Sequence, residues 1–194
     1  MIRKADRDRE HLQTVEPLNK LYARERDMER VPVTLANGQA LNLLPREHNA
    51  LFKKIIDEFC PVFTPGGRIV YVGDTGEKRA YFDATILKGL GVAVAEHDNM
   101  PDVVVHHVEK NWLVLIEAVT SHGPVNPKRY QELKRLFAGS KAGLVFVTAF
   151  PDRHKMAKYL DDISWGTVVW VAESPTHLIH FNGERFLGPY EDEG

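Results

Sequence analysis

The sequence has 194 residues, a formal net charge of −2 at pH 7 and 43% hydrophobic residues. This length and composition suit one α/β domain with a short extension, and the charge balance excludes a histone-like or arginine-rich DNA binder. Cys60 is the only cysteine, which excludes an intrachain disulfide and a cysteine-rich zinc site. With no apolar run of membrane-spanning length, we expect a soluble, cytoplasmic protein without a membrane partner.

The N-terminal part of the chain predicts a helix, a hairpin and a second helix. Residues 1–30 mix both charge signs with apolar residues near helical spacing, which is typical of an amphipathic helix packed on the domain or on a partner. Residues 31–44 alternate apolar and polar around Asn37-Gly38, a strong signal for a β-hairpin. Segment 46–59 gathers its apolar residues on one face, and we expect this helix to stop before Pro61.

From Gly67 onward, the pattern predicts strands alternating with helices. The expected strands are 68–72, 103–108, 112–119, 143–148 and 167–172, the expected helices are 82–90, 127–137 and 152–160, and a closing hairpin is expected over 178–186 around Asn182-Gly183. The turn between 103–108 and 112–119 is too short for a crossover helix, so these strands form an antiparallel hairpin. The predicted fold class is α/β, with a mixed central β-sheet flanked by helices on both faces.

Two carboxylates on this hairpin are the candidate chemical groups. Glu117 lies in an apolar strand, where a buried ionised carboxylate requires a cation or strong hydrogen-bond donors. A hairpin that turns at Lys110 pairs positions whose numbers sum to about 220, which brings Asp102 opposite the Glu117 end. Two oxygen ligands at one end of a hairpin predict a Mg²⁺ site, and such a metal activates water and stabilises charge on a phosphoryl oxygen.

The same residues form part of a recognisable motif. Pro101-Asp102, a turn, and then Glu117-Ala118-Val119 resemble the signature of the PD-(D/E)xK nuclease superfamily, with valine in place of the lysine. The longer string Leu-Ile-Glu-Ala-Val-Thr-Ser-His-Gly-Pro-Val at 115–125 is more specific, and with it the chain resembles the BsuBI/PstI family of type II restriction endonucleases. Further matching segments are 71–78, 127–129, 147–153 and 180–183.

This resemblance covers roughly residues 40 to 190 and implies a restriction-endonuclease-like fold. It implies an enzyme of a restriction-modification system, a homodimer that hydrolyses phosphodiester bonds in both strands of a short palindrome in double-stranded DNA with Mg²⁺. The palindrome is CTGCAG in the members that give the family its name. Residues 31–194 would be the catalytic domain. Family members carry a further N-terminal domain, and only the charged stretch 1–30 stands in its place here.

Val119 departs from the superfamily motif. In such sites the lysine positions the attacking water and stabilises the developing charge, and valine does neither. Lys128 is the first candidate for the replacement, His122 the second and Lys78 the third. The alternative is that Lys128 and Arg129 only contact phosphates, and both roles add positive charge that helps to hold DNA.

Other polar residues near the motif have two open interpretations. Asp74, in a Gly-Asp-Thr-Gly turn, is a candidate third metal ligand, although aspartates in such turns commonly hydrogen-bond their own backbone. Ser121 lies in a small polar loop before a basic helix and is a candidate DNA-backbone contact, as is Lys78. His106 and His107 are interpreted as structural histidines rather than zinc ligands.

Two other functions remain as alternatives. A nucleotide-binding α/β domain would use the loop 73–76 to hold phosphate, but the chain lacks both the P-loop spacing and the dinucleotide fingerprint. A catalytically inactive DNA-binding relative would have kept the fold and lost the lysine. The residues that read bases are not identifiable from the sequence, because direct readout depends on groove geometry.

Overall fold

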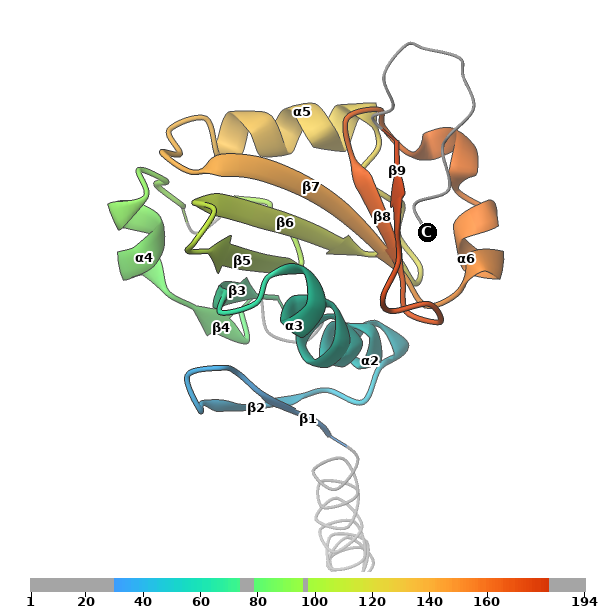
Figure 1. Cartoon of the computed structure of the whole chain (residues 1–194), viewed down its shortest axis with the longest axis horizontal. Helices are drawn as coiled ribbons and strands as arrows, with labels where there is room; N and C mark the ends of the chain where they lie inside the picture. Colours follow the sequence, from blue (N-terminus) through green and yellow to red (C-terminus); the bar gives the residue numbers. More distant parts are fainter. Residues whose placement is uncertain (1–29, 74–78, 96–97, 182–194) are drawn as a thin grey trace, which may run out of the picture.

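The computed structural model describes residues 30–73, 79–95 and 98–181, and its centre is a seven-stranded sheet in the order β4-β3-β5-β6-β7-β8-β9 (Figure 1). The strands are β3 (Arg68–Val72), β4 (Tyr81–Phe82), β5 (Val103–His107), β6 (Trp112–Ala118), β7 (Gly143–Phe150), β8 (Val168–Val171) and β9 (Leu178–His180). Strands β4, β3, β5 and β6 pair antiparallel, β6, β7 and β8 pair parallel, and β9 returns antiparallel to β8. The prediction of a mixed sheet in an α/β fold is confirmed.

The hairpin of β5 and β6 has the predicted register. Val103 pairs with Ile116, and His107 pairs with Trp112. The turn between the strands includes Asn111 at φ 50°, a left-handed conformation that asparagine tolerates better than most residues. One step further along this register places Asp102 opposite Glu117, at the end of the hairpin away from the turn.

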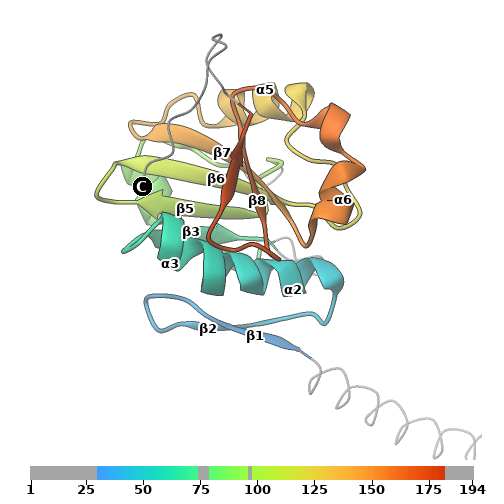
Figure 2. The same cartoon turned by 45° about the vertical axis from the view of Figure 1, so that its right-hand side comes forward.

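Helices cover both faces of the sheet, as predicted (Figures 1 and 2). One face is covered by α2 (Glu47–Lys54), η1 (Ile55–Phe59) and α3 (Cys60–Phe63), and the opposite face by α4 (Ala84–Gly89) and α5 (Pro127–Leu136). Side chains alternate along β6, so Ile116 and Ala118 join the cluster under α2, whereas Leu113 and Leu115 pack with Leu133 of α5. The β5–β6 hairpin is therefore packed between two apolar layers.

The predicted N-terminal hairpin is present as β1 (Val31–Thr34) and β2 (Ala40–Leu43). Its Val33 and Leu43 are almost fully buried and belong to the same apolar cluster as Phe52 of α2. The hairpin therefore lies on the outer side of α2, which separates it from the sheet (Figure 2).

The prediction that the first described helix stops before Pro61 is wrong. Helical backbone continues from α2 through the π-helical segment η1 into α3, which ends at Phe63. In the π-helical segment, the N–H of Cys60 donates to the carbonyl of Ile55, five residues back. Proline has no N–H to donate within a helix, and Pro61 is tolerated here as the second residue of α3, directly after the π-helical segment.

Several other boundaries differ from the predictions. Tyr81–Phe82 forms the short strand β4, and α4 begins only at Ala84, after Asp83 accepts the N–H of Ile86 as N-cap. The helix predicted over 152–160 is reduced to α6 (Arg153–Ala157), followed by the 3₁₀ turn η2 (Leu160–Asp162).

At the end of the described chain, Leu178–His180 forms β9 and pairs with β8. The predicted turn at Asn182-Gly183 and the charged helix predicted over 1–30, apart from Arg30, lie outside the described residues. Within the part of the chain that the structure describes, no helix is both long and apolar enough to cross a membrane.

Candidate active site

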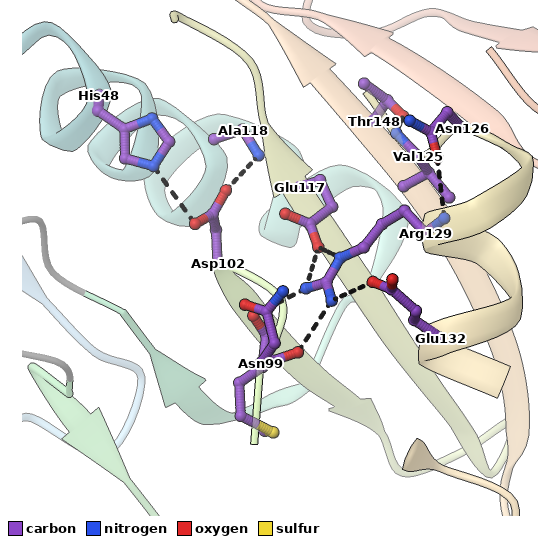
Figure 3. Close-up of polar contacts among 11 residues, drawn as sticks. His48, Asn99, Asp102, Glu117, Ala118, Val125, Asn126, Arg129, Glu132 and Thr148 are labelled. Atoms are coloured by element: carbon purple, nitrogen blue, oxygen red, sulfur yellow. Dashed lines mark hydrogen bonds and ion pairs between the residues drawn. The ribbon is translucent and has the colours of Figure 1, made fainter. Parts of the chain in front are cut away.

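Asp102 and Glu117 converge at the open end of the β5–β6 hairpin (Figure 3). Oδ2 of Asp102 accepts the backbone N–H of Ala118 at 2.7 Å, which ties the start of β5 to the end of β6. Oδ1 of Asp102 lies 3.3 Å from Nε2 of His48, a residue of α2. The Asp102 side chain is 25% exposed and that of Glu117 is 14% exposed, so both carboxylates are largely withdrawn from water yet reachable from the surface.

The ionisation of Glu117 reflects this environment. Burial, together with the negative charge of Asp102, raises the pKa of Glu117 to about 7, and Arg129 acts in the opposite direction. The two carboxylates place negative charges close together, and that repulsion disfavours the ionised form of Glu117. A divalent cation bound between them would relieve that repulsion.

The residues present fit a Mg²⁺ site. Mg²⁺ prefers oxygen ligands, keeps several of its waters and is commonly held by one or two carboxylates. Among the described residues, no group of three or more His, Cys, Asp and Glu side chains is arranged to hold a metal. Glu132 also lines the pocket, but Asp102 and Glu117 are the two carboxylates at the end of the hairpin. Asp74, the third ligand proposed from the sequence, lies outside the described residues.

The two carboxylates open into a pocket of about 390 Å³. Its walls also include His48, His122, Lys128 and Arg129. A larger cavity of about 860 Å³ lies between the β1–β2 hairpin, α3 and β3, but neither carboxylate lines it. The smaller pocket is therefore the candidate active site.

The N-terminus of α5 is fixed at the edge of this pocket. Asn126 is the N-cap, and its Oδ1 accepts the N–H of Arg129 at 2.8 Å. The N–H of Val125 donates to Oγ1 of Thr148 on β7 at 3.1 Å, which anchors the loop that enters the helix. The predicted helix start at Pro127 is confirmed, and the cap fixes the first turn, whose Lys128 and Arg129 both line the pocket.

The two basic residues at this helix start differ in their surroundings. The Lys128 side chain is 87% exposed, and its Nζ lies 3.8 Å from Oε1 of Glu132. The Arg129 side chain is only 14% exposed and ion-pairs with Glu117, its Nη2 lying 2.7 Å from Oε1 (Figure 3). Lys128 is therefore available to an incoming ligand, whereas Arg129 is already engaged with Glu117.

Val119, at the position of the motif lysine, is part of the core. Its side chain has no exposed surface and packs in a cluster with Phe150, Val169 and Val171. Its backbone N–H continues the sheet by donating to the carbonyl of Ala149 at 2.8 Å. A lysine here would bury its charge among apolar side chains, which explains the departure from the motif.

The structure brings most of the sequence-predicted residues to one place. Lys128, Arg129 and His122 line the pocket with the carboxylates, and Ser121 is exposed beside it with its Oγ 3.2 Å from Nδ1 of His122. Lys78 lies outside the described residues. His48 was missed, because a histidine within the amphipathic pattern of a helix does not indicate which strand end the helix will cover.

Known restriction endonucleases are similar to this chain over the region that contains the site. A family model described as the BsuBI/PstI restriction endonuclease domain matches residues 31–184. The chain is 56% identical over 181 residues to the type II restriction enzyme BsuBI of Bacillus subtilis, a match that covers 93% of this chain and 57% of that protein. It is 28% identical over 183 residues to the type II restriction enzyme AplI of Arthrospira platensis, covering 91% and 56% of the two chains.

A solved structure, that of the SdaI restriction endonuclease, has a TM-score of 0.81 and 43% sequence identity to this chain. The similarity covers 89% of this chain and 54% of that one. The chain thus spans a little over half the length of these relatives.

Proposed function

Because the chain belongs to the BsuBI/PstI restriction endonuclease domain family, we propose that it is a type II restriction endonuclease, which hydrolyses phosphodiester bonds of double-stranded DNA in a Mg²⁺-dependent reaction. The observation that carries this proposal is the convergence of Asp102 and Glu117 in one partly buried pocket. A glutamate in an apolar strand requires a positive partner, and although Arg129 supplies one, the nearby charge of Asp102 favours a bound cation as well.

The roles of the chain's own groups follow from their contacts. Mg²⁺, when bound, would supply a polarised water and stabilise the charge that develops on the phosphoryl oxygens. Asp102 is presented in a defined orientation because the Ala118 N–H holds one of its oxygens and His48 approaches the other. Lys128 and His122 stand at the open side of the pocket, where a scissile phosphate would arrive.

The DNA substrate is supported by the surface beside the pocket. Lys128 projects from the first turn of α5, and the exposed residues 121–123 form the neighbouring loop. Cationic and small polar groups of this kind contact the phosphate backbone and position the duplex without reading its sequence. Since the chain carries no net positive charge, binding would depend on this local surface.

The site cut and the assembly are further parts of the proposal. The family resemblance favours the palindrome CTGCAG, and a palindrome cut in both strands suits a homodimer, because the two-fold symmetry of the protein matches that of the site. The single cysteine suits a reducing cytoplasm.

A catalytically inactive DNA-binding relative is the second candidate, favoured by the burial of Val119 in place of the motif lysine. Supercoiled plasmid that contains CTGCAG, incubated with the purified chain and Mg²⁺ or Mn²⁺, separates the two functions. The nuclease proposal expects linear DNA whose ends map to one short palindrome, and the same plasmid without that site should remain supercoiled. Intact plasmid with both metals, together with measurable duplex binding, would support the inactive relative instead.

A further inference from the structure

Each nitrogen of the Arg129 guanidinium donates to an acceptor within the protein (Figure 3). Nε donates to Oε1 of Glu117 at 2.8 Å, and Nη2 lies 2.7 Å from the same oxygen and donates to the carbonyl of Met100 at 2.9 Å. Nη1 donates to the carbonyl of Asn99 at 3.0 Å and lies 3.5 Å from Oε2 of Glu132. Three hydrogen bonds and two ion-pair contacts therefore engage all three guanidinium nitrogens within the protein.

These acceptors belong to the two segments that carry the candidate metal ligands. Glu117 is one ligand itself, on β6, and Asn99 and Met100 lie directly before Pro101-Asp102, at the start of β5. One side chain therefore connects the end of one strand to the segment that leads into the other. Residues that hydrogen-bond to metal-binding carboxylates orient them, and losing such a residue commonly lowers metal affinity or activity about 10- to 100-fold.

The helix that carries Arg129 is itself immobilised. The Arg129 backbone N–H bonds to the N-cap Asn126, and Val125 is bonded to Thr148 in the sheet. The position of the guanidinium is therefore set by a helix start that is hydrogen-bonded to the sheet. Its planar fork suits several acceptors at once, which the single ammonium of a lysine does not.

We propose that Arg129 is a positioning residue, which holds Glu117 and the segment before Asp102 together and places next to Glu117 the positive charge that Val119 does not provide. This inference rests on the proposed function, and it separates Arg129 from its neighbour Lys128. Lys128 faces solvent and contacts DNA, whereas Arg129 acts through the acidic pair and contacts no phosphate.

The test compares R129A, R129Q and R129K with the matched control K128A in the full chain, each checked for folding by thermal unfolding. At saturating duplex and Mg²⁺, we expect single-turnover cleavage to fall about 10- to 100-fold in R129A and R129Q. R129K should recover little of it, because one ammonium does not span Glu117 and both carbonyls. Duplex binding is also measured without metal at several salt concentrations. The slope of the logarithm of the binding constant against the logarithm of salt concentration should be unchanged in all Arg129 variants, and its magnitude should fall by about one in K128A.

A second readout does not depend on cleavage. In metal-free protein, amide hydrogen exchange across residues 98–103 should accelerate in R129A and R129Q and stay at the wild-type rate in K128A. The inference is overturned if cleavage and exchange remain at wild-type values in these variants, if R129K restores full cleavage, or if R129A lowers the salt dependence as K128A does. Failure of the wild-type chain to cut any DNA would instead overturn the proposed function, and faster exchange in R129A would still establish the tether.

Discussion

His48 joins helix α2 to the acidic pair, because its Nε2 lies 3.3 Å from Oδ1 of Asp102 while its Nδ1 lies 3.2 Å from Oγ1 of Thr120. The His48 side chain is 15% exposed, and its ring packs at a tilt against Phe52 of the same helix, with the ring centres 4.6 Å apart. When the Thr120 hydroxyl donates a hydrogen bond to Nδ1, the ring proton lies on Nε2, and this N–H donates a hydrogen bond to Asp102. Both oxygens of Asp102 would then accept a hydrogen bond, one from His48 and one from Ala118.

Removing this support should weaken the site without unfolding the protein. We expect H48A to lower single-turnover cleavage about 10- to 100-fold, because the Asp102 carboxylate loses one of its two contacts. H48Q, which keeps an N–H donor, should retain more activity than H48A. Equal loss in both variants would mean that ring packing on Phe52, and not the donor, is what matters.

The carboxylates themselves should be indispensable. E117Q and D102N keep the shape of each side chain and remove the charge that a divalent cation needs, so cleavage should fall by about 10³-fold or more. The control is D57N, which removes an exposed carboxylate that pairs with Lys53 away from the pocket and should cut at the wild-type rate. Residual cutting by E117Q above one tenth of wild type would sink the metal role of Glu117.

Replacement of Lys128 tests whether this residue contacts a DNA phosphate or acts as the catalytic lysine. Its high exposure favours the first role, so K128A should weaken duplex binding and leave the rate at saturating DNA almost unchanged. K134A is the control, since Lys134 lies in the last turn of the same helix, with its Nζ 5.4 Å from the centre of the Tyr130 ring. A large fall in rate at saturating DNA would restore Lys128 as the displaced catalytic lysine.

Restoring the motif lysine should not repair the site. V119K places an ammonium in an apolar cluster, and an unpaired buried charge of this kind costs about 3 kcal/mol or more of the free energy of unfolding. V119A, which only leaves a small cavity, should cost about 2 kcal/mol or less. Urea unfolding measures both, and a V119K protein that is as stable as wild type and cuts faster would show that this side chain reaches the pocket.

Cys60 should be chemically inert in the folded protein. Burial raises the pKa of its thiol to about 12, with a small further increase from Asp57. At pH 8 the thiolate fraction is then about a thousandfold below that of a free cysteine, and reaction with a thiol reagent should slow in proportion. The urea-unfolded chain is the control, and reaction of folded protein at the unfolded rate would contradict the burial.

The part of the site that the sequence predicted is local in the chain. Glu117 is conspicuous in an apolar strand, and a short turn dictates an antiparallel partner whose register follows from counting residues. The strands with strongly alternating or β-branched patterns were predicted within one or two residues for the same reason. Helix ends were predicted less well, because the π-helical segment before Pro61 and the Asp83 cap depend on neighbours that a periodicity does not include.

By itself, therefore, the sequence determined the mixed sheet and the pairing of Asp102 with Glu117, since both depend on strand periodicity and a tight turn. Only the tertiary structure decided which other groups complete the site. His48 is separated from Asp102 by 54 positions and reaches it because α2 packs across the sheet. Arg129, which the sequence suggested as a DNA contact, turns toward Glu117 because the capped start of α5 is bonded to β7. Such contacts depend on how packed layers meet, and no local pattern encodes that.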